Sequence, residues 1–172
     1  MSIPDAPAAD TPLGLVNLQW IVVNDNVMGG RSNGGFDIDG GELRFAGSTN
    51  TNGGGFSSIR SREIRADLST YDGIQLRVKG DGRRYTWRLS TDARWRGRQV
   101  GYWADFETRK GEWTTVRIPF SEWVPTSFGR KLDRPLLDPA TVNSVGFMLY
   151  DKRAGRFALE VDSITAYRGS SP

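Results

Sequence analysis

The 172 residues contain no cysteine and no histidine. Without histidine there is no Ser-His-Asp triad and no imidazole general base. Without cysteine there is no thiolate nucleophile, no disulfide and no Cys/His zinc site. These two absences exclude the commonest catalytic and metal-binding arrangements, so we expect a protein that is not an enzyme.

No apolar run approaches the ~20 residues of a membrane span. The first residues, 1–12, carry three prolines and two aspartates but no basic residue, unlike a secretory signal or a transit peptide. We expect a flexible arm over residues 1–14, one domain over 15–168 and a tail over 169–172. We expect a cytoplasmic protein without a transmembrane segment, with a position peripheral to a membrane as the alternative.

No segment shows a sustained helical period, whereas alternation with period two recurs along the chain. Glycine is abundant, with 21 residues, and glycine-containing turns separate the alternating segments. The best helical candidate is one turn at 120–124, and 125–143 is predicted to be a long irregular loop. This pattern predicts an all-β jelly-roll sandwich of about nine or ten strands with minimal helix. The predicted strands are 74–78, 85–89, 115–118 and 157–162, and with weaker patterns 18–23, 42–46, 55–60, 100–107 and 145–150.

The net charge of +3 comes from 19 arginines and 4 lysines against 20 acidic residues, and it is unevenly spread. Residues 83–98 carry a net charge of +5, and the rest of the chain is therefore −2. Arginine forms bidentate contacts with phosphate and carboxylate and stacks on aromatic rings. We expect Trp95 to be exposed, because its segment is polar. The candidate binding face comprises Arg84, Trp87, Arg88, Arg94, Trp95, Arg96, Arg98 and Trp103, although a solvated face of arginine stems over tryptophan fits as well.

Two glycine-rich segments are candidate loops. The first contains Asp25, Met28, Gly29, Gly30 and Ser32, and a rigid turn at the sheet edge is favoured over a ligand-binding lip. The second runs from residue 50 to residue 60. It has no Lys and Ser/Thr of a P-loop, so a hairpin loop that enters a strand is favoured, with Phe56 in the core.

Paired carboxylates are the remaining candidates for acid–base chemistry or for calcium. Asp37 and Asp39, and likewise Asp105 and Glu107, lie two residues apart, which places each pair on one face of a strand. Such pairs serve glycoside hydrolysis or ligate Ca²⁺. A solvent-exposed face or turn is the favoured interpretation, so we expect no cofactor and keep a structural calcium ion as an unsupported alternative.

Several motifs together resemble the complex I intermediate-associated protein 30 family over residues 18–168. The first two are Asp25-x-Val27-Met28-Gly29-Gly30-x-Ser32 and Gly53-Gly54-Gly55-Phe56-Ser57-Ser58-x-Arg60. Then follow Leu68-x-x-Tyr71-Asp72-Gly73, Gly80-Asp81-Gly82-Arg83-x-Tyr85, Trp113-x-x-Val116-x-Ile118-Pro119-Phe120, and Gly146-Phe147-Met148 before Phe157-x-Leu159. The resemblance singles out Asp25, Met28, Gly29, Gly30, Ser32, Gly54, Gly55 and Phe56 as motif-loop residues.

The resemblance implies a jelly roll similar to galactose-binding domains, and a chaperone-like role in assembling a membrane-associated respiratory or photosynthetic complex. It supplies no catalytic residues. The expected partners are protein subunits of such a complex. A carbohydrate-binding module is the alternative function, with a sugar as ligand. Single-stranded nucleic-acid binding through the Arg/Trp stretch 83–103 is a further and less favoured alternative.

Overall fold

The computed structural model describes residues 11–12, 18–24, 33–39, 42–50, 55–127 and 130–169. Its single-turn 3-10 helices are η4 (Phe120–Glu122) and η5 (Pro139–Thr141). Its strands are β1 (Thr11–Pro12), β2 (Trp20–Asn24), β3 (Asn33–Asp39), β4 (Glu42–Thr49), β5 (Ser57–Ser61), β6 (Gly73–Lys79), β7 (Arg84–Trp95), β8 (Arg98–Glu107), β9 (Trp113–Pro119), β10 (Val124–Ser127), β11 (Arg130–Lys131), β12 (Ser144–Leu149) and β13 (Gly155–Tyr167).

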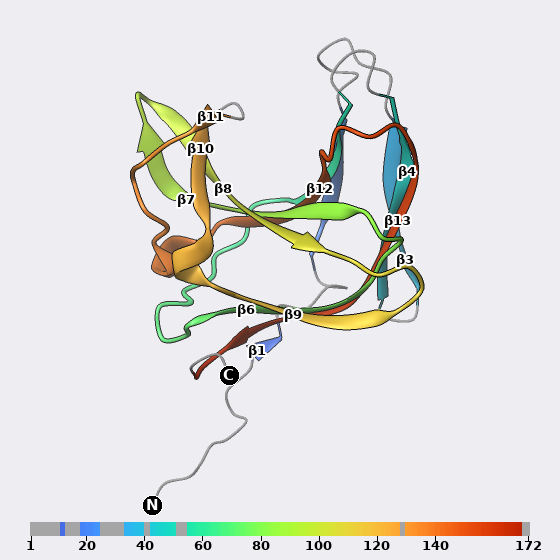
Figure 1. Ribbon diagram of the computed structural model, residues 1–172. Coiled ribbons are helices and arrows are strands. Elements are labelled where there is room, and N and C mark those ends of the chain that lie inside the picture. The colour runs from blue at the N-terminus through green and yellow to red at the C-terminus, as the bar shows by residue number, and fades with distance from the viewer. Residues whose placement is uncertain are drawn as a thin grey trace, which may run out of the picture.

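In this part of the chain the strands form two antiparallel sheets that pack face to face (Figure 1). One has six strands in the order β3-β4-β13-β6-β9, with β1 paired to β13. The other has seven in the order β11-β10-β8-β7-β12-β5-β2. Along the chain, β3 and β4 lie in the six-stranded sheet, β5 in the other, β6 in the first, β7 and β8 in the second, β9 in the first, β10 to β12 in the second, and β13 in the first. This arrangement is a jelly roll, and the predicted fold class is confirmed.

The core lies between the two sheets and is built from alternate residues of each strand. Trp87 is fully buried in it, stacked on Phe147 at a centroid distance of 5.9 Å and in edge contact with Trp123 at 5.3 Å. The predicted alternation on β6 and β13 is confirmed, since the large apolar residues of both strands are buried and their polar neighbours are not. The fully buried large side chains include Phe45, Leu43, Ile59, Ile74, Leu76, Tyr85, Tyr102 and Leu149.

Two parts of the strand prediction differ from the structure. β3 has no strand-like composition, because it contains two glycines and two aspartates. It nevertheless pairs along its whole length with β4, with Phe36 opposite Phe45. The predicted loop 125–143 is wrong at its start, where β10 and β11 extend the seven-stranded sheet. Proline disfavours a central strand, but Pro125 lies next to the sheet edge.

A buried arginine joins the two sheets at one end of the sandwich. Arg83 precedes β7, is 6% exposed, and donates to both carboxylate oxygens of Asp151, with Nε–Oδ2 and Nη2–Oδ1 distances of 2.9 and 2.7 Å. It also donates to Thr49 Oγ1 on β4 at 3.2 Å and to the carbonyls of Gly155 and Arg156 on β13, each at 3.1 Å. One guanidinium thus links the start of β7 to two strands of the other sheet.

Asp81, two residues before Arg83, makes a second link between the sheets. Its Oδ2 accepts hydrogen bonds from Tyr85 Oη at 3.0 Å and from the backbone N–H of Ala158 on β13 at 2.8 Å. Gly82, between Asp81 and Arg83, adopts a φ of +92°, a backbone conformation that favours glycine. The Gly-Asp-Gly-Arg-x-Tyr motif is therefore explained by the fold, as a clamp that holds β7 against β13.

We predict that Asp151→Asn lowers the free energy of unfolding by about 3–5 kcal/mol, because it leaves the Arg83 charge buried without a counter-ion. Burial alone would raise the pKa of Asp151, but the hydrogen bonds and charge of Arg83 outweigh it and lower that pKa. The carboxylate thus stabilises the fold at neutral pH, and this contribution is lost below about pH 4. Urea denaturation at several pH values measures both effects.

The matched control is Asp162→Asn, because Asp162 faces Arg77 at 3.8 Å on the surface, with 44% of its side chain exposed. We expect the control to change the free energy of unfolding by less than about 1 kcal/mol. Equal effects of the two variants would contradict a special role for the buried pair.

Candidate functional site

The outer face of the seven-stranded sheet, turned away from the six-stranded sheet, is concave. Figure 1 shows β10 and β11 rising at one side of this sheet and β12 at the other, with β7 and β8 crossing between them. Several residues of the basic stretch 83–98 project from its two central strands, β7 and β8. The question is therefore which residues of the predicted binding face lie on this outer face.

One cross-strand row on the outer face brings two arginines together. Arg60 on β5 lies opposite Gly146 on β12, and Gly146 lies opposite Arg88 on β7. Arg88 in turn lies opposite Trp103 on β8. Because Gly146 has no side chain, nothing from β12 stands between the two arginines in this row. We call Arg60, Gly146, Arg88 and Trp103 the arginine row.

Both guanidinium groups of the row have a lowered pKa. Burial lowers the pKa of Arg88, and the positive charge of Arg60 lowers it further, to about 9. Burial also lowers the pKa of Arg60. In the described part of the chain, no carboxylate lies within 4.0 Å of either guanidinium. Both groups are still protonated at pH 7, so the row holds two positive charges that are not neutralised by these residues.

Polar atoms next to the row converge above Gly101 on β8. A Cβ atom at this glycine would lie 3.0 Å from Arg88 Nη2 and 3.5 Å from both Trp103 Nε1 and Thr126 Oγ1. Thr126 Oγ1 donates to the Gly101 carbonyl at 2.9 Å. Trp103 Nε1 and Arg60 Nε are buried and have no hydrogen-bond partner among the described residues. The row therefore ends in donors that lack acceptors.

The predicted candidate binding face is divided by the structure. Arg88 and Trp103 lie in the arginine row, and Arg84 is exposed with its Nε 3.7 Å from Asp105 Oδ2. Trp87 was a wrong assignment to this face, because it points into the core and has no exposed surface. Successive side chains along β7 point alternately to the core and to the outer face. Only every second residue of the stretch can therefore reach the outer face.

The remaining predicted residues lie at the tip of the β7–β8 hairpin, residues 94–98. Arg94, Arg96 and Arg98 are exposed there. Trp95 is only partly buried but packs against the core, so the expectation of an exposed tryptophan is wrong. The Arg96 guanidinium covers its ring at 4.5 Å from the centroid. Trp95 is thus a support for the hairpin tip.

Arg60 was not among the predicted site residues. In the sequence it only closes the second glycine-rich motif. The signal that could have found it is its position next to Ile59, which is fully buried, because successive residues of a strand point to opposite faces. That alternation turns Arg60 to the outer face, but its distance from Arg88 depends on strand order.

The motif-loop residues Asp25, Met28, Gly29, Gly30, Ser32 and Gly54 lie outside the described residues. Gly55 is described, buried, and has a φ of +79° that suits glycine. Phe56 is not part of the buried core, contrary to expectation. It is partly buried and packs edge-on against Tyr150, with a centroid distance of 6.4 Å.

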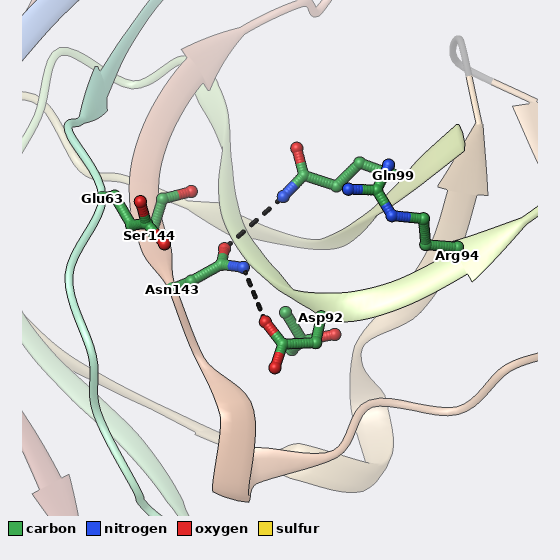
Figure 2. A pocket seen from close by; sticks show the side chains of 7 residues that line it. Glu63, Asp92, Arg94, Gln99, Asn143 and Ser144 are labelled. Atoms are coloured by element: carbon green, nitrogen blue, oxygen red, sulfur yellow. Dashed lines mark hydrogen bonds between the residues drawn. The ribbon is translucent and has the colours of Figure 1, made fainter. Parts of the chain in front are cut away.

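A polar pocket of about 510 Å³ adjoins the row where β7 and β12 meet. Figure 2 shows Asn143 at its centre, accepting from Gln99 Nε2 at 3.5 Å and donating to Asp92 Oδ1 at 3.3 Å. Its remaining lining residues are Glu63, Thr91, Arg94 and Ser144. The Ser144 hydroxyl donates to Ser90 Oγ at 3.0 Å, and Ser90 lies two residues from Arg88. The pocket can offer hydrogen bonds, but its described lining contains no aromatic ring for stacking.

The paired carboxylates do not form a metal site in the described part of the chain, where no cluster of three or more suitable ligands occurs. Asp37, Asp39, Asp105 and Glu107 are exposed. Asp105 is engaged with its neighbours, because its Oδ1 accepts from Thr86 Oγ1 at 2.7 Å.

Among the described helices, none is long and apolar enough to cross a membrane.

Comparisons with known proteins agree with the motifs. The family model for Complex I intermediate-associated protein 30 matches residues 15–161. The mitochondrial protein of that name from Mus musculus is 35% identical over 111 residues, which cover 62% of this chain and 33% of the mouse protein. Its Drosophila melanogaster counterpart is 33% identical over 131 residues, which cover 64% of this chain and 42% of the fly protein. The chain thus spans well under half the length of these relatives.

Two solved structures of similar shape are carbohydrate-binding modules. The family 11 module from Clostridium thermocellum in complex with a β-1,3-1,4-mixed-linked tetrasaccharide superposes with a TM-score of 0.73 over 95% of this chain and 98% of the module. The family 11 module of a cellulosomal cellulase from the same organism superposes with a TM-score of 0.71 over 95% of this chain and 96% of the module. Both are 16% identical to this chain, so the likeness concerns the fold alone.

We predict that Arg88→Met raises the free energy of unfolding by about 1–3 kcal/mol in a chloride buffer at pH 7, because it removes a poorly solvated cation that repels Arg60. Urea denaturation measures the change. The control is Arg65→Met at an exposed position, where we expect a change within about 0.5 kcal/mol. A marked loss of stability in Arg88→Met would mean that the folded chain itself neutralises this arginine.

Proposed function

Because the chain belongs to the complex I intermediate-associated protein 30 family, we propose that it is a non-catalytic binding module that assists the assembly of a membrane-associated respiratory complex. Its matched relatives are named for association with complex I intermediates, and we extend that association to this chain. The absence of cysteine and histidine from the whole sequence supports a role without catalysis. The proposed place of action is the surface of the membrane that holds the complex.

The proposed docking surface is the outer face of the seven-stranded sheet together with the hairpin tip. The observation that carries this assignment is the concentration of positive charge there. Arg60 on β5 and Arg88 on the central strand β7 lie on it without a described counter-ion, Lys131 is exposed on β11, and three further arginines lie at the tip. The carboxylate of Asp105, two residues from Trp103 on β8, is already engaged by Thr86 and Arg84.

The occupant that fits this surface is a protein segment that carries carboxylates. Complementary charge accelerates the encounter of two proteins and selects the partner, more than it adds affinity. Arginine suits the task because its planar guanidinium binds a carboxylate through two parallel hydrogen bonds. We therefore propose an acidic segment of a subunit, or of a subassembly, as the client of this domain.

The four lysines provide a direct test by cross-linking in the organism's own membranes, followed by mass spectrometry. Lys131 lies on the proposed surface, whereas exposed Lys110 lies outside it and serves as the internal control. We expect cross-links from Lys131 to acidic segments of one membrane-bound respiratory complex, and few from Lys110. Equal yields from both lysines, or no subunit of such a complex, would count against the proposal.

Charge reversal provides the matching variant. Arg94→Glu, Arg96→Glu and Arg98→Glu together reverse the hairpin tip, while Arg65→Glu, Arg109→Glu and Arg156→Glu reverse three exposed arginines elsewhere. We expect the first set to reduce the Lys131 cross-links at least about tenfold and the second set to leave them unchanged. Circular dichroism verifies that both variants fold.

Carbohydrate binding is the second candidate, favoured by the polar pocket around Asn143 and by the fold shared with sugar-binding modules. Against it, the described pocket lining offers hydrogen bonds without a stacking surface. A mixed-linked β-glucan tetrasaccharide that bound this pocket would raise the melting temperature of the purified chain. We expect no shift, and a shift abolished by Asn143→Ala would favour the sugar-binding function instead.

A further inference from the structure

Two arginines face each other across a glycine in the arginine row, and their positive charges are not neutralised by the described residues. We propose that Arg60, Arg88 and the indole N–H of Trp103 form a binding site for a divalent oxyanion of the phosphate class. The site lies on the floor of the outer face and would serve a small ligand whether or not a protein client docks above it. It therefore goes beyond the proposed function and does not depend on it.

The first argument is the unmet hydrogen-bonding capacity of the row. Arg60 Nε and Trp103 Nε1 are donors only, and both are buried without an acceptor in the described part of the chain. The indole N–H groups of Trp20, Trp87 and Trp123 also lack an acceptor, but these side chains belong to the hydrophobic core, whereas Arg60 and Trp103 lie in the row on the outer face. An oxyanion supplies the missing acceptors, and its several oxygens can serve more than one donor.

The second argument concerns two glycines, one in the row and one beside it. Gly146 separates Arg60 from Arg88, and a Cβ atom there would lie 2.6 Å from the Ile59 carbonyl oxygen, so close packing against β5 requires a glycine between the two arginines. Gly101 leaves open the point at which Arg88 Nη2, Trp103 Nε1 and Thr126 Oγ1 converge, 3.0 to 3.5 Å from a Cβ position. A larger residue at Gly101 would occupy the point at which these polar atoms converge.

The third argument is electrostatic and selects the charge of the ligand. Two like charges held close together repel, and partial burial increases the cost because the interior screens charge less than water. The lowered pKa of Arg88 reflects this repulsion together with burial. A singly charged carboxylate would neutralise one guanidinium, whereas a doubly charged phosphate neutralises both. Guanidinium groups also match the geometry of phosphate oxygens through bidentate hydrogen bonds.

The neighbouring surroundings favour a small, localised anion. On one side, the polar pocket places Glu63 and Asp92 in its lining, and these carboxylates would repel an extended polyanion. On the other side, the carboxylate of Asp105 follows Trp103 by two residues on the same face of β8. Acidic groups thus border the row at both ends of β7, which confines the attraction for an anion to the arginine row.

The Trp103 indole N–H gives a direct readout by NMR on the purified full chain. Titration with inorganic phosphate should move the indole resonance of Trp103, assigned by its loss in Trp103→Phe, in a saturable manner. The indole of Trp113, on the outer face of the other sheet, serves as the internal control and should stay in place. Sulfate should reproduce the effect, whereas acetate and chloride at equal ionic strength should not.

Substitutions then assign the binding to the row. We expect Arg88→Gln and Arg60→Gln each to weaken phosphate binding at least about tenfold, and exposed Arg65→Gln to leave it unchanged. Gly101→Ala should weaken binding as well, because its new methyl group takes the space above the strand. Arg88→Lys keeps the charge but loses the planar fork, and it replaces Arg88→Gln should that variant not fold.

A parallel titration with glycerol 3-phosphate distinguishes free phosphate from a phosphate ester as the source of the oxyanion. Tighter binding of the ester assigns the site to a phosphorylated metabolite, and tighter binding of inorganic phosphate assigns it to the free ion. The proposal is overturned if no oxyanion moves the Trp103 resonance, if chloride moves it equally, or if Arg65→Gln weakens binding as much as Arg88→Gln. The Lys131 cross-linking experiment does not depend on phosphate binding. The phosphate-site proposal and the proposed assembly function can therefore fail independently of each other.

Discussion

The arrangement of the two sheets depends on the buried ion pair between Arg83 and Asp151. Its guanidinium, at the start of β7, reaches a hydroxyl on β4 and two carbonyls on β13, and the carboxylate of Asp151 neutralises it. Asp81 adds a second set of hydrogen bonds between Tyr85 and β13. Because β7 is held here, its alternate residues keep their orientation along the sheet, with Trp87 in the core and Arg88 on the outer face.

Arginine therefore has two opposite roles, at Arg83 just before β7 and at Arg88 within β7. Arg83 has every part of its guanidinium paired, and the hydrogen bond to Asp151 raises its pKa. Arg88, five residues later, faces another arginine, and its pKa is lowered by burial and by that neighbour. A paired cation stabilises the sandwich, whereas an unneutralised one costs stability and creates affinity for an anion. This contrast separates the arginines that build the fold from those that are available for binding.

The sequence predicted the sandwich because alternation with period two is a local property. Ile74, Leu76 and Val78 are buried as their spacing required. It failed for β3, whose glycines and aspartates become a strand only through pairing with β4, and for Pro125 in β10. The candidate site was predicted in part, since Arg88 and Trp103 were named but Arg60 was not. Trp87 was assigned to the wrong face although its own alternation with Tyr85 and Leu89 placed it inside.

The absence of cysteine and histidine, the all-β architecture and the family motifs could all be read from the residue order, because each depends on composition or on neighbours a few positions apart. The tertiary structure alone decided which arginines meet. Arg60, Gly146 and Arg88 come from three strands that become adjacent only when β12 inserts between β5 and β7. Strand order in a jelly roll is set by the packing of both sheets over a common core, so a charge pair across such a row has no local signature in the sequence.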